Sequence, residues 1–189
     1  MKRYPLAFGA GITGIKTCAV DIIVQKQVEK RKEIDWKRAM TFGSFGLCFC
    51  GVWQYYLYNK IFPVLTPGTF KFAKKSMAEK MRDMRGIKNV GIKLFVDMGI
   101  NSPFLFFPSF YIIKESFRQG RVSVLSALKV YRENFWQDVP AIWSVWLPAQ
   151  TINFAFSPSY MRVPFVAVIS VGWTAYISMT RGECDEEKT

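Results

Sequence analysis

The sequence predicts an all-α fold: a polytopic membrane helix bundle with about four transmembrane helices plus amphipathic surface helices. Half of the 189 residues are hydrophobic, and long runs carry no charge at all. Uncharged runs of 21, 16, 23 and 18 residues follow Arg38, Asp97, Asp138 and Arg162. Because a helix that crosses a bilayer needs about 20 mostly apolar residues, the runs of 21, 23 and 18 residues are typical of membrane spans. The run of 16 reaches this length only by extending back through residues 91–96, which places Lys93 and Asp97 at membrane depth.

The cations lie in the segments between the hydrophobic runs. The formal net charge is +12, with six Lys or Arg over 26–38, nine over 60–93 and five over 114–132. This placement favours membrane lipids, including anionic headgroups, as partners. A nucleic-acid-binding protein would gather its cations on one folded surface beside exposed aromatic side chains, so no nucleic acid is expected as a partner.

No residue set for catalysis or cofactor binding can be recognised. The chain contains no histidine, which excludes His-based zinc and haem sites and the triads that use His as a base. Residues 9–14 are rich in glycine but lack the Lys-Ser/Thr ending and the preceding strand of a phosphate-binding loop. We therefore expect no enzyme, no cofactor and no metal site.

The first hydrophobic segment, residues 5–25, is predicted to be a retained membrane helix. A signal peptide would have an uninterrupted apolar core, whereas Lys16 and Asp21 interrupt this one. Small residues recur at four-residue spacing and would let a second helix approach closely. Polar residues at the same spacing form a stripe on one face: Thr13, Thr17, Asp21 and Gln25.

A second helix is expected at about 39–60, ending in an aromatic cluster suited to the headgroup layer. Residues 69–85 then alternate apolar side chains with Lys and Arg. This pattern favours an amphipathic helix lying on the membrane surface, and a solvated loop is the alternative.

The third helix, expected at about 87–113, also carries a polar stripe at four-residue spacing: Asn89, Lys93, Asp97 and Asn101. Residues 122–136 are predicted as a short amphipathic helix. The apolar block 139–180 is split by Ser157-Pro158 and by Arg162-Val163-Pro164, and can form two spans or one span with a re-entrant piece. We expect a single domain over 1–182 and an acidic, disordered tail over 183–189.

The C-terminal third resembles a known family. Its motif residues are Trp143, Trp146, Pro148, Gln150, Asn153, Phe154, Pro158, Arg162, Trp173 and Ser178. Their spacing is similar to that of the Mpv/PMP family of small integral membrane proteins of peroxisomes and the mitochondrial inner membrane. Weaker likeness extends to the segments Asp21-x-x-x-Gln25, Asp35-x-x-Arg38 and Lys93-x-x-x-Asp97. The family's Gly-Pro-x-x-His-x-Trp-Tyr is reduced here to the aromatic stretch from Gly51 to Tyr58.

The resemblance implies a channel-like protein for small solutes or metabolites, in the mitochondrial inner membrane or, alternatively, the peroxisomal membrane. The intramembrane polar candidates for lining such a path are Thr17, Asp21, Gln25, Lys93, Asp97, Asn101, Gln150, Asn153 and Arg162. The other motif residues, Trp143, Trp146, Pro148, Phe154, Pro158, Trp173 and Ser178, are assigned structural roles.

A competing interpretation gives the same polar residues a structural role. Asp21 or Asp97 would pair with Lys93 or Arg162, while Gln150 and Asn153 would form hydrogen bonds between helices. The protein would then be a non-catalytic accessory or scaffold subunit packed into a larger membrane complex. A homo-oligomer is compatible with either interpretation.

Overall fold

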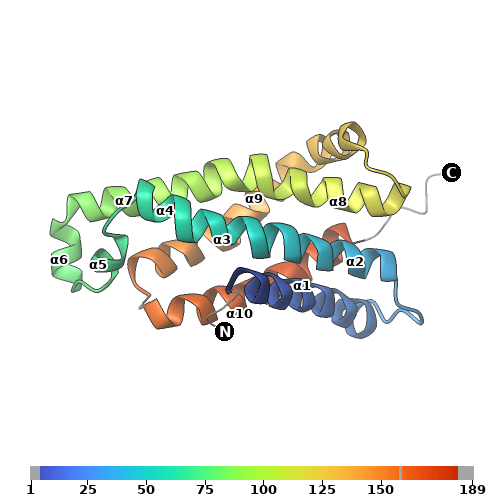
Figure 1. Ribbon diagram of the computed structural model, residues 1–189, viewed down its shortest axis with the longest axis horizontal. Helices are drawn as coiled ribbons and strands as arrows, with labels where there is room; N and C mark the ends of the chain where they lie inside the picture. The colour runs from blue at the N-terminus through green and yellow to red at the C-terminus, as the bar shows by residue number, and fades with distance from the viewer. Residues whose placement is uncertain (1–4, 158, 183–189) are drawn as a thin grey trace. The chain divides into compact units, whose positions relative to one another are not determined.

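The computed structural model describes residues 5–157 and 159–182, and the regular elements in these ranges are all helices (Figure 1). Helices suit long apolar segments because every backbone polar group must be satisfied inside the segment when the surroundings are lipid. The predicted all-α helix-bundle class is confirmed. The expected acidic tail, 183–189, lies outside the described residues.

The helices form a few long stretches joined by short connections. The first stretch is α1 (Pro5–Ile23) with the π-helical segment η1 (Val24–Val28). The second runs through α2 (Trp36–Phe45), η2 (Gly46–Trp53), α3 (Gln54–Tyr56), η3 (Leu57–Ile61) and α4 (Phe62–Leu65). The short helices α5 (Thr69–Ala73) and α6 (Met77–Arg82) follow. The third stretch is α7 (Met84–Leu94), η4 (Phe95–Phe106) and α8 (Phe107–Gln119), and the chain continues with α9 (Val124–Ala155) and α10 (Ser159–Arg181).

The last two helices correct the predicted boundaries. The separate amphipathic helix expected at 122–136 is the first half of α9, which continues through Pro140 and Pro148 to Ala155. Proline is tolerated inside such helices when neighbouring helices satisfy the backbone groups that it frees. The predicted break at 157–158 is present between α9 and α10, whereas the one expected at 162–164 lies within α10.

Two of the described helical stretches, Leu6–Val28 and Met84–Gln119, have the length and apolar composition needed to cross a membrane. They correspond to the first and third of the helices expected from the sequence. The total of about four spans stays a prediction.

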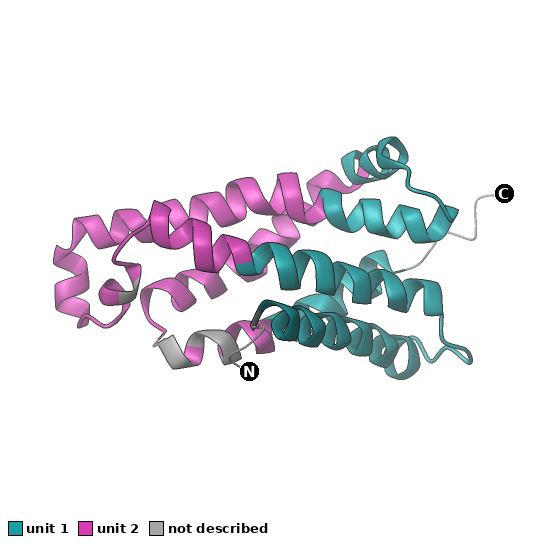
Figure 2. Cartoon of the chain, viewed as in Figure 1, with its two compact units in different colours: residues 1–55, 108–132, 170–189 teal, residues 56–107, 133–169 magenta. Residues whose placement is uncertain are grey.

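The chain divides into two compact units, each made of separate segments (Figure 2). Unit 1 contains residues 1–55, 108–132 and 170–189, and unit 2 contains residues 56–107 and 133–169. The expectation of a single domain over 1–182 stays a prediction.

In unit 1, α1 packs against α2 and η2 through small residues. A Cβ atom added to Gly46 would collide with the Thr17 side chain, and one added to Gly51 would collide with Ala10. The Thr17 hydroxyl also donates a hydrogen bond to the Phe42 carbonyl at 2.8 Å. The small-residue stripe of the first helix therefore brings two backbones close together, and Asp21 follows one turn after Thr17 on the same face.

The core of unit 2 is aromatic and joins the helices that carry its polar residues. Phe62 and Phe154 are almost fully buried, with their ring centroids 6.2 Å apart in an edge-to-face arrangement. Phe72 of α5 and Val90 of α7 belong to the same buried cluster. Edge-to-face pairs of this kind hold rings in a defined orientation, so the ends of these helices are fixed around the polar side chains described next.

Candidate functional site

Two clusters of buried and half-buried polar side chains contain most of the predicted residues, one in each unit of the described chain. We call the cluster of unit 1 the arginine cluster; it consists of Asp21, Gln25, Glu29, Arg38 and Ser178. We call the cluster of unit 2 the aspartate cluster; it consists of Tyr58, Asp97, Asn101, Gln150 and Asn153.

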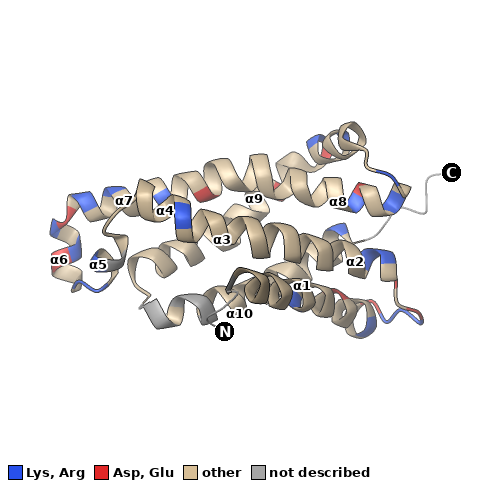
Figure 3. Cartoon of the chain, in the orientation of Figure 1, with Lys and Arg blue, Asp and Glu red and all other residues tan. Residues whose placement is uncertain are grey.

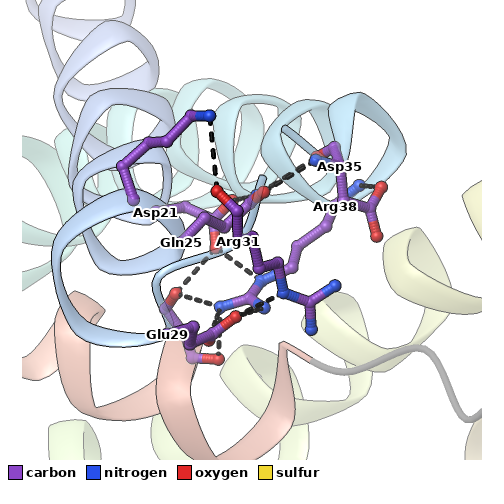
Figure 4. A network of polar contacts seen from close by, with 8 residues as sticks. Asp21, Gln25, Glu29, Arg31, Asp35 and Arg38 are labelled. Carbon is purple, nitrogen blue, oxygen red and sulfur yellow. Dashed lines mark hydrogen bonds and ion pairs between the residues drawn. The ribbon is translucent and has the colours of Figure 1, made fainter. Parts of the chain in front are cut away.

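Arg38 is the centre of the arginine cluster and is only 1% exposed. Its Nε donates to Asp21 Oδ1 at 2.8 Å, and its two Nη atoms donate to the Glu29 carboxylate at 2.9 and 2.7 Å (Figure 4). Nη2 also donates to the Ser178 hydroxyl at 2.8 Å and to the Ser178 carbonyl at 2.9 Å. Two-pronged contacts between a guanidinium and a carboxylate are strong and geometrically specific, so the buried positive charge is neutralised in place.

Asp21 is enclosed by donors from other segments of unit 1. Oδ1 accepts a hydrogen bond from the Ser178 hydroxyl at 2.7 Å, and Oδ2 accepts one from Gln25 Nε2 at 2.7 Å. Gln25 Oε1 in turn accepts the backbone N–H of Asp35 at 2.7 Å. Asp35 caps α2 by accepting the backbone N–H of Arg38 at 3.0 Å. The helix cap and the polar stripe of α1 thus orient the same arginine (Figure 4).

Glu29 lies at the edge of the arginine cluster, just beyond the membrane-length stretch that ends at Val28. The hydrogen bond from Arg38 lowers the pKa of the Glu29 carboxyl; burial opposes this shift, and a second hydrogen bond, from Arg31 at 2.6 Å, adds to it. Glu29 is therefore ionised at neutral pH and holds the outer side of the guanidinium.

Asp97 is the centre of the aspartate cluster and lies in η4, where it is 2% exposed. Tyr58 donates its hydroxyl to Asp97 Oδ2 at 2.5 Å, and Gln150 Nε2 donates to the same oxygen at 3.1 Å. Asn101 Nδ2 donates to Oδ1 at 3.1 Å. Gln150 Nε2 also lies 2.6 Å from the Tyr58 hydroxyl. These hydrogen bonds to the carboxylate all come from neutral side chains.

The side-chain oxygen of Asn153 accepts no hydrogen bond from the rest of the aspartate cluster. Its Nδ2 donates to Gln150 Oε1 at 3.1 Å, while its Oδ1 is buried and has no hydrogen-bond partner among the described residues. Leaving a buried acceptor unpaired costs about 1–3 kcal/mol. A polar solute or a water molecule that offers a donor to this oxygen would recover that cost.

Lys93 lies one helical turn before Asp97 and is also buried. Its Nζ lies 4.9 Å from the ring centroid of Phe154 and 5.2 Å from that of Phe62. Cations over aromatic faces are attracted by the ring quadrupole. The aromatic core of unit 2 therefore holds the ammonium group next to the aspartate cluster.

The structure places most of the predicted residues in one of these two clusters. Asp21 and Gln25 belong to the arginine cluster, and Ser178, which was assigned a structural role, joins them. The spacing of the third helix and of the C-terminal motif brings Asp97, Asn101, Gln150 and Asn153 together. Of the other candidates, Thr17 takes part in helix packing, while Pro158 and the side chain of Arg162 lie outside what the structure describes.

The tryptophans of the motif behave differently from one another. Trp143 donates its indole N–H to the Met98 carbonyl at 2.8 Å, joining α9 to η4 within unit 2. Trp173 is 5% exposed, whereas Trp146 is half-buried and Pro148 is exposed. Phe154 belongs to the core of unit 2. Trp173 and Phe154 are buried as packing residues are, whereas the structural role of the exposed Pro148 stays a prediction.

Sequence reasoning did not include Arg38, Glu29 and Tyr58 among the candidates. Asp21 pairs with Arg38 and not with Lys93 or Arg162, the partners expected from the sequence. The segments Asp21-x-x-x-Gln25 and Asp35-x-x-Arg38 were already visible as family likenesses, and their joint occurrence was the available signal. Tyr58 ends the aromatic stretch that remains of a family motif, but its pattern predicted only a place in the headgroup layer.

Comparison with known proteins gives a consistent set of relatives. The model of the Mpv17 / PMP22 family matches residues 116–178. The chain is 27% identical over 194 aligned residues to Protein SYM1 of Saccharomyces cerevisiae, covering 99% of this chain and 89% of the relative. It is 27% identical over 184 residues to PXMP2/4 family protein 4 of Dictyostelium discoideum, covering 94% and 87%. It is 23% identical over 187 residues to Peroxisomal membrane protein 2 of Bos taurus, covering 94% and 84%. No solved structure matches the chain.

Proposed function

We propose that this chain, which is similar to the Mpv17/PMP22 family, is a channel-like protein that lets small polar solutes or metabolites pass through an organelle membrane. The family model and the relatives confirm the resemblance predicted from the sequence and support a place in a membrane of the mitochondrion or the peroxisome. Of the two, we take the mitochondrial inner membrane as the first expectation. The aspartate cluster is the polar part of the proposed path.

The observation that carries this proposal is the unpaired Oδ1 of Asn153 beside the Asp97 carboxylate. Ionisable side chains at membrane depth normally face the interior of a bundle or a water-filled cavity, because exposure to lipid is costly. The neutral donors around Asp97 can be exchanged for those of a solute, since each such hydrogen bond contributes only about 0.5–1.5 kcal/mol net. The cluster therefore combines a buried carboxyl group with an acceptor that is free for a passing donor.

The proposal is tested by recording conductance of the purified protein in planar bilayers. We expect discrete openings in the wild type, and a changed ion selectivity in Asp97→Asn and in Lys93→Met. Ser144→Ala is the matched control, because this exposed hydroxyl on α9 only donates to the Ala141 carbonyl of its own helix. A silent wild type, with Asp97→Asn losing only stability, would refute the channel.

A second candidate function, an accessory or scaffold subunit in a larger membrane complex, is favoured by the arginine cluster. A carboxylate, a guanidinium and a buried hydroxyl that are fully paired with one another act as a fixed connection between helices rather than as a path. This candidate predicts that the chain co-purifies with a larger assembly in mild detergent and conducts nothing when reconstituted alone.

A further inference from the structure

We propose that the helices α5, α6 and the start of α7 form a binding surface for anionic phospholipids. We call it the basic methionine surface, and the residues that define it are Lys71, Lys74, Met77, Met81, Met84 and Arg85, all of them exposed. Figure 3 shows Lys and Arg gathered along these helices. Lipid binding here is separate from the proposed passage of solutes through unit 2.

The segment is a defined structure and not a loose loop. Helix α6 begins with a capping box, in which the backbone N–H of Ser76 donates to Glu79 Oε2 at 2.8 Å. Phe72 of α5 is buried in the aromatic core of unit 2, and a Cβ added to Gly86 would collide with its ring. Because these contacts fix the backbone, the side chains on the outer face are presented in a constant arrangement.

The exposed face carries three apolar side chains. Met77, Met81 and Met84 are 59%, 75% and 72% exposed, and the first two lie one turn apart on the same face of α6. Methionine side chains are long, flexible and apolar, so they adapt to irregular surfaces. A group of exposed apolar side chains marks a surface that is covered by a partner.

The charge around the methionines identifies that partner. Residues 71–88 contain seven Lys or Arg and two acidic residues, which gives a net charge of +5. One of the seven, Lys75, forms an ion pair with Asp83 at 2.6 Å and stabilises the segment itself. Lys71, Lys74 and Arg85 are exposed beside the methionines. A basic segment with an apolar face is complementary to a layer of anionic headgroups over acyl chains.

The position of the surface along the chain also favours lipid over a soluble partner. The membrane-length stretch Met84–Gln119 contains 36 residues, which correspond to about 54 Å of helix. The hydrocarbon core of a bilayer is only about 30 Å thick, and the central part of this stretch, 98–113, is the part without charge. Its first turns, which carry Arg85, therefore extend beyond the hydrocarbon core on the side of the headgroups, and the basic methionine surface precedes them directly.

The test is methionine oxidation of the full chain, reconstituted in liposomes of phosphatidylcholine alone or of phosphatidylcholine with phosphatidylglycerol. Peroxide crosses the membrane, and mass spectrometry gives the oxidation rate of each methionine. We expect Met77, Met81 and Met84 to be oxidised about fivefold more slowly in the anionic liposomes. Met40 and Met179, both 51% exposed and outside the surface, should be oxidised at equal rates in the two membranes.

The variant Lys71→Gln/Lys74→Gln/Arg85→Gln should lose this protection, while the matched variant Lys30→Gln/Lys32→Gln/Lys37→Gln, which removes three exposed cations from unit 1, should keep it. The wild type alone gives an independent check, because about 1 M salt shortens electrostatic screening to about 3 Å and should abolish the protection. Equal oxidation in both membranes would overturn the proposal. Protection by a soluble polyphosphate in phosphatidylcholine liposomes, or protection that does not depend on lipid charge, would overturn it in favour of a soluble or a protein partner.

Discussion

The arginine cluster and the aspartate cluster both bury a carboxylate, but they do so by different physical means. Asp21 faces a guanidinium that is itself shared with Glu29 and Ser178. Asp97 faces a phenol and two amides. Removing one member of a buried ion pair leaves an uncompensated charge and costs about 3–5 kcal/mol, whereas a lost neutral hydrogen bond costs about 1–3 kcal/mol. The first arrangement is suited to fixing helices, and the second to exchanging partners.

The largest effect should follow from removing the guanidinium. Arg38→Met leaves Asp21 and Glu29 without their cation, so we expect a loss of about 3–5 kcal/mol in the free energy of unfolding, measured by thermal or denaturant unfolding in detergent. Lys37→Met removes an exposed neighbouring cation and should change stability by less than about 0.5 kcal/mol. Equal effects of the two changes on stability would show that the arginine cluster does not hold the helices of unit 1 together.

The aspartate cluster should respond more weakly to the loss of one donor. Tyr58→Phe removes the hydroxyl that donates to Asp97 and lies 2.6 Å from Gln150 Nε2. We expect a loss of about 1–3 kcal/mol in stability, together with a change in bilayer conductance. Tyr56→Phe, on a side chain that is 45% exposed, is the control. A Tyr58→Phe protein as unstable as Arg38→Met would make the two clusters equivalent.

The two clusters also differ in how far the sequence could predict them. Periodicity alone placed Asp97 and Asn101 on one helix face, and the motif spacing added Gln150 and Asn153. The arginine cluster was only half visible, because Arg38 looks like the last cation of a charged loop. Its burial depends on how closely α1 and α2 approach through Gly46 and the neighbouring small residues, and a local pattern does not specify that approach.

The same limit explains the errors in the helix boundaries. The sequence predicted a separate amphipathic helix at 122–136 before the apolar block 139–180, yet α9 continues from one into the other through Pro140 and Pro148. Whether a proline interrupts a membrane helix depends on neighbouring groups that satisfy the freed carbonyls, and these neighbours come from tertiary structure. Tyr58 is a second example. An aromatic side chain near the end of a membrane helix can lie in the headgroup layer or donate a hydrogen bond to a buried carboxylate, and the local sequence does not distinguish the two; here the hydroxyl donates to Asp97.

A change at Asn153 should affect solute passage without a large change in stability, which separates the two roles proposed for the clusters. Asn153→Leu keeps a similar shape, removes the buried acceptor that has no described partner and gives up one hydrogen bond to Gln150. The two changes oppose each other, so stability should shift by less than about 1 kcal/mol. Conductance should nevertheless fall, because the free acceptor of the proposed path is gone. Unchanged conductance in Asn153→Leu would show that the unpaired acceptor takes no part in solute passage, and the channel proposal would lose the observation that carries it.

The smallest effect concerns pH and the edge of the arginine cluster. The pKa of Glu29 is lowered in the folded protein, first by the hydrogen bond from Arg38, relative to an ordinary value of 4.5. A lowered folded pKa means that the contribution of Glu29 to stability is fully present above the ordinary value and is lost as the pH falls through the folded one. Unfolding measured from neutral pH down to acid should therefore show a loss of stability below pH 4.5. Glu29→Gln should reduce this loss, and Glu33→Gln, on an exposed residue of the same loop, should leave it unchanged. If Glu33→Gln reduced the acid-induced loss of stability equally, general repulsion among the loop cations would be responsible for that loss. The ion pair between Glu29 and Arg38 would then contribute nothing specific to stability.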